Sequence, residues 1–315
     1  MSIFSSTAAL GVTPQDLGSN SGTFGIPEFR TRFTRQMLDD TMPKKFSDLV
    51  RISGFSHGTN VWLDNAQELI RNGTSTLSDA ISARDDIMMY LIHKGIDPLL
   101  SFKTMENVRK GKGIQPDVIE KLKAGGIPDW YIESCLKIKY LFPRAHATAY
   151  VMMAYRIAFC KVHYPLAFYA AYFSIRAAEF DANLISQGKE QIKARLKELD
   201  ALENLSVKDK GLQIVLELAW EMYIRGYYVE KVDLYGSLAD KFVIHEKSLQ
   251  PPFAALDGLG SSAAKNIVEA RKDGEFSSID DLKKRTGISK TVVEILREHG
   301  CLTGMTESDQ MELFM

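Results

Sequence analysis

The side chains best suited to chemistry in this 315-residue chain gather in residues 137–165, KIKYLFPRAHATAYVMMAYRIAFCKVHYP. Pro143 fits the first position of a helix, because its missing N–H leaves no donor unpaired there. Such a helix carries Arg144, His146 and Tyr150 in its first two turns, with His146 and Tyr150 on one face. Backbone donors, the helix dipole and these side chains suit a triphosphate, and the tyrosine could stack on a base. The segment predicts a nucleotide site, although lone histidines and helical tyrosines are also common in ordinary packed helices.

Further cationic groups precede this segment. Residues 109–113, RKGKG, predict a flexible basic loop that carries Lys110 and Lys112, and Arg51 and His57 add donors. Between Lys103 and Lys161 there are eleven Lys or Arg and five Asp or Glu, a local excess of six positive charges. Such a loop is often only solvated, so its composition alone assigns no function.

A second candidate site lies near the end of the chain. The sequence Leu-Asp-Gly-Leu-Gly at 256–260 leads into a helix, an arrangement in which two glycines bring backbone N–H groups close to a phosphate. Residues 286–290, TGISK, are a degenerate second copy. Together they resemble a tandem helix-hairpin-helix module, which holds duplex DNA through its backbone. The expected duplex-binding residues are Gly258, Gly260, Ser261, Ser262, Lys265, Gly287, Ser289 and Lys290.

The last six residues contain a possible peptide anchor. Gln310, Leu313 and Phe314 follow an acidic stretch and resemble the sliding-clamp-binding peptide of bacteria, QxxLF. Two large apolar groups would fill a pocket while the glutamine amide fixes the register. The alternative is a frayed terminus that happens to end in Leu-Phe.

Helical periodicity dominates the elements that must position these residues. Apolar residues recur three or four positions apart in most segments between Gly and Pro, whereas residues 1–30 look irregular. Short strand-like pieces occur at 227–232 and 241–246, and residues 249–253, LQPPF, suggest a linker. The expected fold is mainly α: a helical bundle, then a small α+β region and a tandem helix-hairpin-helix module.

Composition limits the classes of protein to which the chain could belong. The chain has 39 basic and 40 acidic residues, a net charge of −1, and 45% hydrophobic residues. These values exclude a disordered chain and do not favour a dedicated nucleic-acid binder, which is usually basic. Three widely spaced cysteines indicate a reducing compartment, and neither a secretory signal nor a membrane span is evident. We expect a cytoplasmic protein with no membrane partner.

Long motifs then point to a family. The stretch FPRAHATAYVMMAYRIAFCKVHYPLAFYAAYF resembles the fingers signature of bacterial C-family replicative polymerases. SDLVRISGFSHGTNVWLDNAQELIRNGT, RKGKG, VDLYGSLADKFVI and the QxxLF end narrow the resemblance to the PolC-type DNA polymerase III alpha subunit. It covers essentially the whole chain. Two departures are the degenerate second hairpin and Met315, which extends beyond the usual terminal Phe.

The resemblance implies a division of labour along the chain. Residues 1–180 would be polymerase fingers, 181–250 a connecting α+β region, 251–302 the duplex-binding module and 303–315 a flexible clamp-binding tail. Incoming dNTP and primer-template DNA would meet a set of fingers residues: Arg51, His57, Lys110, Lys112, Arg144, His146 and Tyr150. The sliding clamp (the beta subunit) and the palm-containing part of the polymerase would be protein partners.

The resemblance also bears on activity. Family members hold two metal ions on palm aspartates that precede the fingers, and those are expected to be absent here. Adjacent Asp85 and Asp86 point in different directions on a helix and make a poor substitute. The chain is therefore expected to be an inactive C-terminal portion of a DNA-directed DNA polymerase that needs Mg²⁺ when intact, with no metal or cofactor of its own. Open alternatives are a stand-alone DNA-binding or clamp-adaptor protein and a split-polymerase subunit; a nuclease is the weakest.

Overall fold

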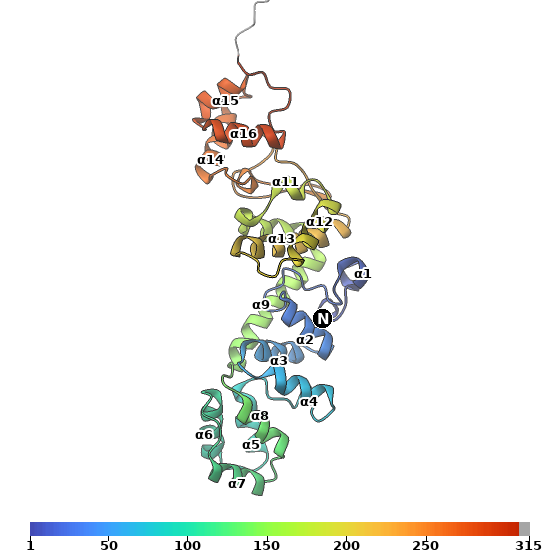
Figure 1. The fold of residues 1–315 in the computed structure, drawn as a ribbon, viewed down its shortest axis with the longest axis vertical. Helices are drawn as coiled ribbons and strands as arrows, with labels where there is room; N and C mark the ends of the chain where they lie inside the picture. The colour runs from blue at the N-terminus through green and yellow to red at the C-terminus, as the bar shows by residue number, and fades with distance from the viewer. Residues whose placement is uncertain (309–315) are drawn as a thin grey trace, which may run out of the picture. The chain divides into compact units, whose positions relative to one another are not determined.

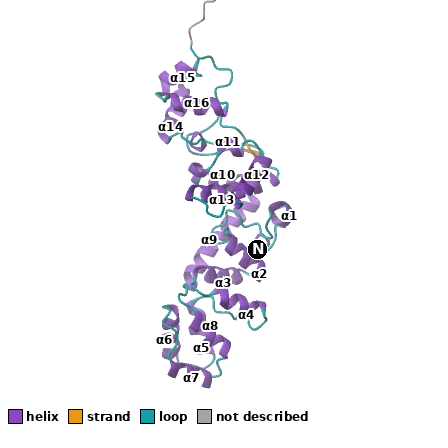
Figure 2. Ribbon diagram, in the orientation of Figure 1, coloured by secondary structure: helices purple, strands orange, loops and turns teal. Residues whose placement is uncertain are grey.

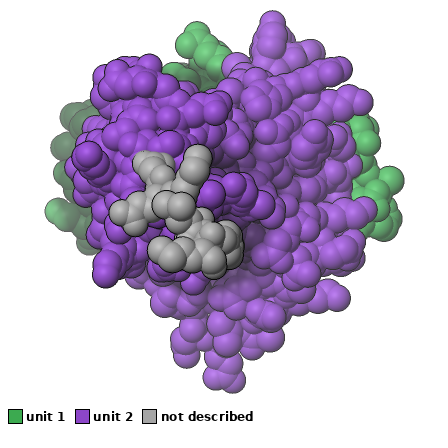
Figure 3. Space-filling model, turned by 90° about the horizontal axis from the view of Figure 1, so that it is seen from above, with its two compact units in different colours: residues 1–158 green, residues 159–315 purple. Residues whose placement is uncertain are grey.

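Helices make up most of the secondary structure in the computed structural model, which describes residues 1–308 (Figures 1 and 2). Two compact units are present, residues 1–158 (unit 1) and residues from 159 onward (unit 2), coloured separately in Figure 3. The expected mainly α fold with a small sheet is confirmed.

The helices of unit 1 run from the N-terminus to the long helix in which the unit ends: α1 (Pro14–Leu17), α2 (Arg32–Thr41), α3 (Phe46–His57), α4 (Gln67–Arg71), α5 (Arg84–His93), α6 (Pro98–Arg109), α7 (Pro116–Ala124), α8 (Asp129–Lys137) and α9 (Arg144–His163). The α-helices and strands that follow are α10 (Pro165–Ile175), α11 (Ala182–Ile185), α12 (Lys189–Asp200), α13 (Val207–Ile224), β1 (Tyr228–Val229), β2 (Val243–Ile244), β3 (Ser248–Gln250), α14 (Ser261–Ala270), α15 (Ile279–Thr286) and α16 (Lys290–His299).

The core of unit 1 begins in the lead-in that looked irregular from sequence. Phe4 of a short helical turn and Phe29 are both fully buried there, and their rings meet edge to face with centroids 5.1 Å apart. Helix α9 packs small residues inward, because Ala147, Val151 and Ala154 recur at helical spacing and are all fully buried. The start of α9, one residue after Pro143, agrees with the sequence expectation.

One turn design joins α5 to α8. In each connection a glycine with positive φ (82°, 69° and 73°) is followed by isoleucine and by a residue that caps the next helix. Glycine adopts this left-handed conformation readily, so the chain turns there and leads into the next helix. The three turns are Gly95-Ile96-Asp97, Gly113-Ile114-Gln115 and Gly126-Ile127-Pro128.

A small sheet with strand order β1-β3-β2 lies in unit 2. Strand β3 pairs parallel to β1 and antiparallel to β2. The predicted strands at 227–232 and 241–246 are present but shorter, and β3 was missed. The linker prediction for residues 249–253 was wrong: Leu249 and Phe253 are fully buried, because β3 occupies the centre of the sheet.

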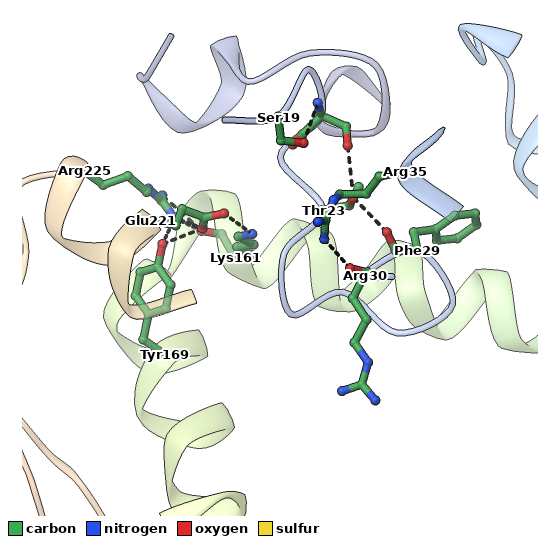
Figure 4. A network of polar contacts seen from close by, with 10 residues as sticks. Ser19, Thr23, Phe29, Arg30, Arg35, Lys161, Tyr169, Glu221 and Arg225 are labelled. Carbon is green, nitrogen blue, oxygen red and sulfur yellow. Dashed lines mark hydrogen bonds and ion pairs between the residues drawn. The ribbon is translucent and has the colours of Figure 1, made fainter. Parts of the chain in front are cut away.

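A buried polar network also holds unit 2 together (Figure 4). Lys161 of α9 forms an ion pair with Glu221 of α13 at 2.7 Å, and both side chains have 0% exposure. The Tyr169 hydroxyl donates to the second oxygen of Glu221, and Arg225 donates to that hydroxyl at 2.8 Å. Buried charges require partners of this kind, so the network fixes how these helices pack within the unit.

Candidate nucleic-acid interface

The two hairpins at the end of unit 2 share one backbone conformation. Gly258 and Gly287 both have positive φ, at 84° and 69°. Two residues later, Gly260 and Ser289 are both extended, at φ/ψ of −68°/155° and −72°/162°, and both cap a helix. The second copy, degenerate in sequence, is therefore complete in structure.

Packing between the hairpins holds both turns in place. Leu259 and Ile288, which occupy equivalent positions, are buried. The side-chain amide of Asn266 in α14 donates to the backbone carbonyl of Thr286 at 3.0 Å, which ties the first helix to the second turn. A Cβ added at Gly258 would lie 3.0 Å from Ile295 of α16. The first turn thus needs glycine for conformation and for space.

All eight predicted duplex-binding residues are exposed. They lie at the N-termini of α14 and α16, where the first backbone N–H groups have no partner within the helix. The caps differ: the Ser289 hydroxyl accepts from the Val292 N–H at 3.3 Å, whereas Gly260 has no side chain to do so. The first hairpin therefore leaves one more N–H for a ligand.

A groove of about 390 Å³ borders the first hairpin, and sequence reasoning missed it. Its walls come from residues 177–181, the start of α13 and residues 254–260. Lys208 and Asp257, both exposed, form a 2.9 Å ion pair at its edge. These residues lie 49 positions apart, and no sequence pattern links them.

Two of the expected nucleotide-binding residues, Arg144 at the start of α9 and Arg51 of α3, meet at Asp86. Asp86 accepts hydrogen bonds from the Ser82 backbone and hydroxyl at 2.9 and 2.7 Å, and forms ion pairs with Arg51 and Arg144. Burial lowers the pKa of both arginines from the usual value. Arg144 remains 42% exposed and Arg51 only 20%, so Arg144 is the more accessible of the two to a ligand.

Asp85 supports the same helix start, since its carboxylate accepts from the Arg144 backbone N–H at 2.9 Å. Both aspartates therefore contact Arg144, Asp85 at its backbone N–H and Asp86 at its guanidinium, and Asp86 also binds the backbone of Ser82. Among residues 1–308 no group of three or more His, Cys, Asp or Glu side chains is arranged to hold a metal ion.

An aromatic stack lies beside this arginine pair. The ring of His57 stacks on Phe142 at 4.8 Å, and Phe142 meets His146 at 6.0 Å. The His57 Nε2 atom lies 3.2 Å from Glu28, and its Nδ1 lies 2.9 Å from the Ser53 carbonyl. His146 and Tyr150 are exposed, as a role in binding requires. The His57 ring is held in one orientation by these contacts with Phe142, Glu28 and Ser53.

Lys110 and Lys112 lie on the separate turn between α6 and α7. In the described part of the chain no hydrogen bond or ion pair joins them to the start of α9. The loop expected to be flexible packs closely against residues 138–141: a Cβ at Gly111 would lie 2.6 Å from the carbonyl oxygen of Lys139. Glu106 pairs with Arg109 and Lys110, which lowers its pKa to about 2.

Two other predictions concern the clamp-binding tail and the absence of a membrane span. Gln310, Leu313 and Phe314, the expected clamp contacts, lie outside the described residues. Within residues 1–308, no helix combines the length and apolar character that crossing a bilayer requires.

Comparisons with known proteins match both the N-terminal part of the chain and the hairpin region. Residues 3–126 match the bacterial DNA polymerase III alpha subunit finger domain, and residues 226–311 match the helix-hairpin-helix motif. All 315 residues align at 56% identity with the DNA polymerase III PolC-type of Caldanaerobacter subterraneus and of Clostridium perfringens, and at 55% with that of Bacillus subtilis. Each alignment covers 100% of this chain and 22% of the relative, so the chain spans about a fifth of their length.

Proposed function

From the premise that this chain matches, over its whole length, the C-terminal region of PolC-type DNA polymerase III, we propose that it binds duplex DNA for a replicative polymerase. The observation that carries the proposal is the shared, exposed backbone conformation of the two hairpins. Helix N-termini at both turns present N–H groups suited to two phosphates. Such contacts hold the duplex without reading its bases.

The start of α9 is proposed to contact the incoming dNTP and the primer-template. Arg144 and His146 offer charge and hydrogen-bond donors at a helix N-terminus, and Tyr150, 51% exposed, offers a ring for stacking. Arg51 and His57 support this surface from α3 through Asp86 and Phe142. Lys110 and Lys112 add positive charge on their own turn.

The C-terminal residues are proposed to anchor the polymerase to its sliding clamp. Gln310 would fix the register of an extended peptide, and Leu313 and Phe314 would fill an apolar pocket. A few large side chains can supply most of the binding energy in such a contact.

Catalysis is proposed to belong to a palm-containing part of the polymerase that this chain does not supply. Carboxylates there would hold the Mg²⁺ ions that phosphoryl transfer needs. In the intact bacterial enzyme, acting in the cytoplasm, residues of this chain would position dNTP and DNA.

A direct test measures duplex binding by fluorescence anisotropy over a range of salt concentrations. Lys290→Gln and Lys265→Gln should each lower the affinity and reduce the salt slope by about 0.9 if the lysine meets one phosphate. Lys272→Gln is the matched control, because Lys272 is exposed but lies beyond the end of α14 and pairs with Glu269. Equal effects of all three substitutions would contradict binding at the hairpins.

Primer extension and clamp titration separate the remaining alternatives. With Mg²⁺ and four dNTPs, the purified chain should extend no primer, and Phe314→Ala should abolish clamp binding. Extension by rigorously pure protein would show that the chain has a catalytic site of its own. If the chain binds duplex and clamp but never restores synthesis when mixed with palm-containing polymerase, a stand-alone adaptor role is favoured instead.

A further inference from the structure

A compact cationic surface forms where the turn between α6 and α7 packs against residues 138–141. Gly111 makes the close approach to the Lys139 backbone, and a Cβ at Gly113 would lie 3.7 Å from Leu136. This packing brings Lys112 and Lys139, 27 positions apart in sequence, onto neighbouring segments. Both are exposed, and neither pairs with a carboxylate of residues 1–308.

The segment 138–141 is fixed to the body of unit 1. Ile138 and Leu141 are fully buried, while Lys139 and Tyr140 between them are exposed. Backbone hydrogen bonds with Thr59 hold the segment on its other side, at 3.0 Å from Thr59 N to Tyr140 O and 3.0 Å from Lys139 N to Thr59 O. Lys139 and Tyr140 are therefore presented from a rigid backbone.

Charge and aromatic character coincide on this surface. The Tyr140 side chain is 40% exposed, and the pKa of Arg109 is raised chiefly by its hydrogen bond to Glu106 and in smaller part by Tyr140. Four cations, Arg109, Lys110, Lys112 and Lys139, accompany one carboxylate, Glu106, which leaves an excess of three positive charges. Glu106 stays ionised at neutral pH and keeps Arg109 and Lys110 in place.

We propose that this surface, defined by Arg109, Lys110, Lys112, Lys139 and Tyr140, binds single-stranded DNA, with the lysines on phosphates and the Tyr140 ring stacked on a base. Proteins that hold single strands combine a cationic track with exposed aromatic rings in this manner. Bases in a duplex are already stacked on both faces, so a ring adds little there. A protein partner fits less well, because lysine is depleted at protein interfaces.

The inference rests on the proposed role in binding primer-template DNA and specifies which strand this surface meets. An unpaired template strand is the single-stranded component of that substrate. Because the duplex is assigned to the hairpins of unit 2, the two sites can be tested independently in the full chain.

The experiment measures anisotropy of a labelled oligothymidylate and of a labelled duplex with the same protein preparations. Lys112→Gln/Lys139→Gln should weaken oligothymidylate binding and lower its salt slope by about 1.4, two phosphates at about 0.7 each. Tyr140→Leu should weaken it about tenfold, while Tyr140→Phe retains the ring and the affinity. Duplex affinity should change little in all three variants.

The control is Lys121→Gln/Lys123→Gln, which removes two exposed lysines of α7 that pair with Asp117 and Asp129. Circular dichroism and thermal unfolding verify that each variant is folded. An equal loss in the control, or retained oligothymidylate binding in Tyr140→Leu, overturns the proposal. Full displacement of the oligonucleotide by dTTP at equal phosphate concentration would also overturn it, in favour of a free-nucleotide site. If duplex binding is lost only in the hairpin variants, the proposed function stands whatever the result with oligothymidylate.

Discussion

Lys161 and Glu221, which are 60 positions apart in sequence, form a fully buried ion pair with Nζ and Oε2 2.7 Å apart. The carboxylate also accepts from Tyr169, whose pKa is raised well above its usual value chiefly because the ring is buried. Taking two charges out of water is costly, and a pair of this kind compensates only when both partners are present.

Lys161→Met should therefore destabilise the folded chain by about 3 kcal/mol, because it removes the nearer cation of a buried carboxylate and leaves only Arg225, 3.9 Å from Glu221. Lys161→Met/Glu221→Gln should recover part of that loss. Urea unfolding measures both, and Lys197→Met, at an exposed position of α12, is the control. A cost below about 1 kcal/mol for Lys161→Met would mean that the pair is solvated.

His299 predicts a pH dependence of stability. Its Nε2 accepts from the Val232 N–H at 2.8 Å and its Nδ1 contacts Asn183, so the folded state holds a neutral ring. Burial, followed by the charge of Lys231, lowers its pKa from the ordinary 6.5. The unfolded chain then binds the proton more readily, so stability should fall as the pH drops below 6.5 and level off below the folded pKa.

His299→Gln removes the titrating imidazole and should flatten the dependence of the unfolding free energy on pH below 6.5. The measurement is the difference in unfolding free energy between variant and parent chain, from about pH 7.5 to pH 5. The difference isolates His299, because the other five histidines are the same in both proteins. Parallel profiles for the two proteins would contradict the assignment.

The paired hairpins allow a comparison of two glycines. Gly287→Ala should cost about 1 kcal/mol because of its positive φ alone, since nothing lies within 4 Å of the added Cβ. Gly258→Ala should cost more, because its Cβ also meets Ile295 at 3.0 Å. Thermal unfolding measures both. Gly260→Ser copies the cap of the second hairpin and should be neutral or slightly stabilising. Equal losses of stability in all three variants would show that neither the positive φ nor the contact with Ile295 determines the cost.

Asp86 is expected to be the most sensitive carboxylate of unit 1. Asp86→Ala leaves the buried Ser82 and Ala83 N–H groups without their acceptor and should cost about 2–4 kcal/mol in guanidinium unfolding. Asp85→Ala removes one bond to the Arg144 N–H and should cost about 1 kcal/mol. The reverse order would place the main support of α9 at Asp85.

Local signals in the sequence were sufficient for much of the helical fold. Pro143 marks the start of α9 within one residue, and the glycine and cap positions of both hairpins have the expected backbone conformation. These features depend on residues within a few positions of one another, where backbone preference dominates.

Features that depend on distant segments could not be predicted. Arg51 and Arg144 lie far apart in sequence yet pair with the same carboxylate, Asp86. The backbone of Lys139 packs against Gly111, in a loop that composition suggested was flexible. Strand β3 has three buried residues and no alternation, so its neighbours rather than its own pattern make it a strand.

The recurring glycine–aliphatic–cap turn also bears on the order of folding. The Ile96 N–H bonds to the Leu91 carbonyl and the Ile127 N–H to the Leu122 carbonyl, each across five positions, so these helix pairs close very short loops. The Lys161–Glu221 pair must close a loop of 60 positions, which costs more chain entropy. We expect the helical hairpins to form first and the buried ion pair to lock unit 2 in a later step.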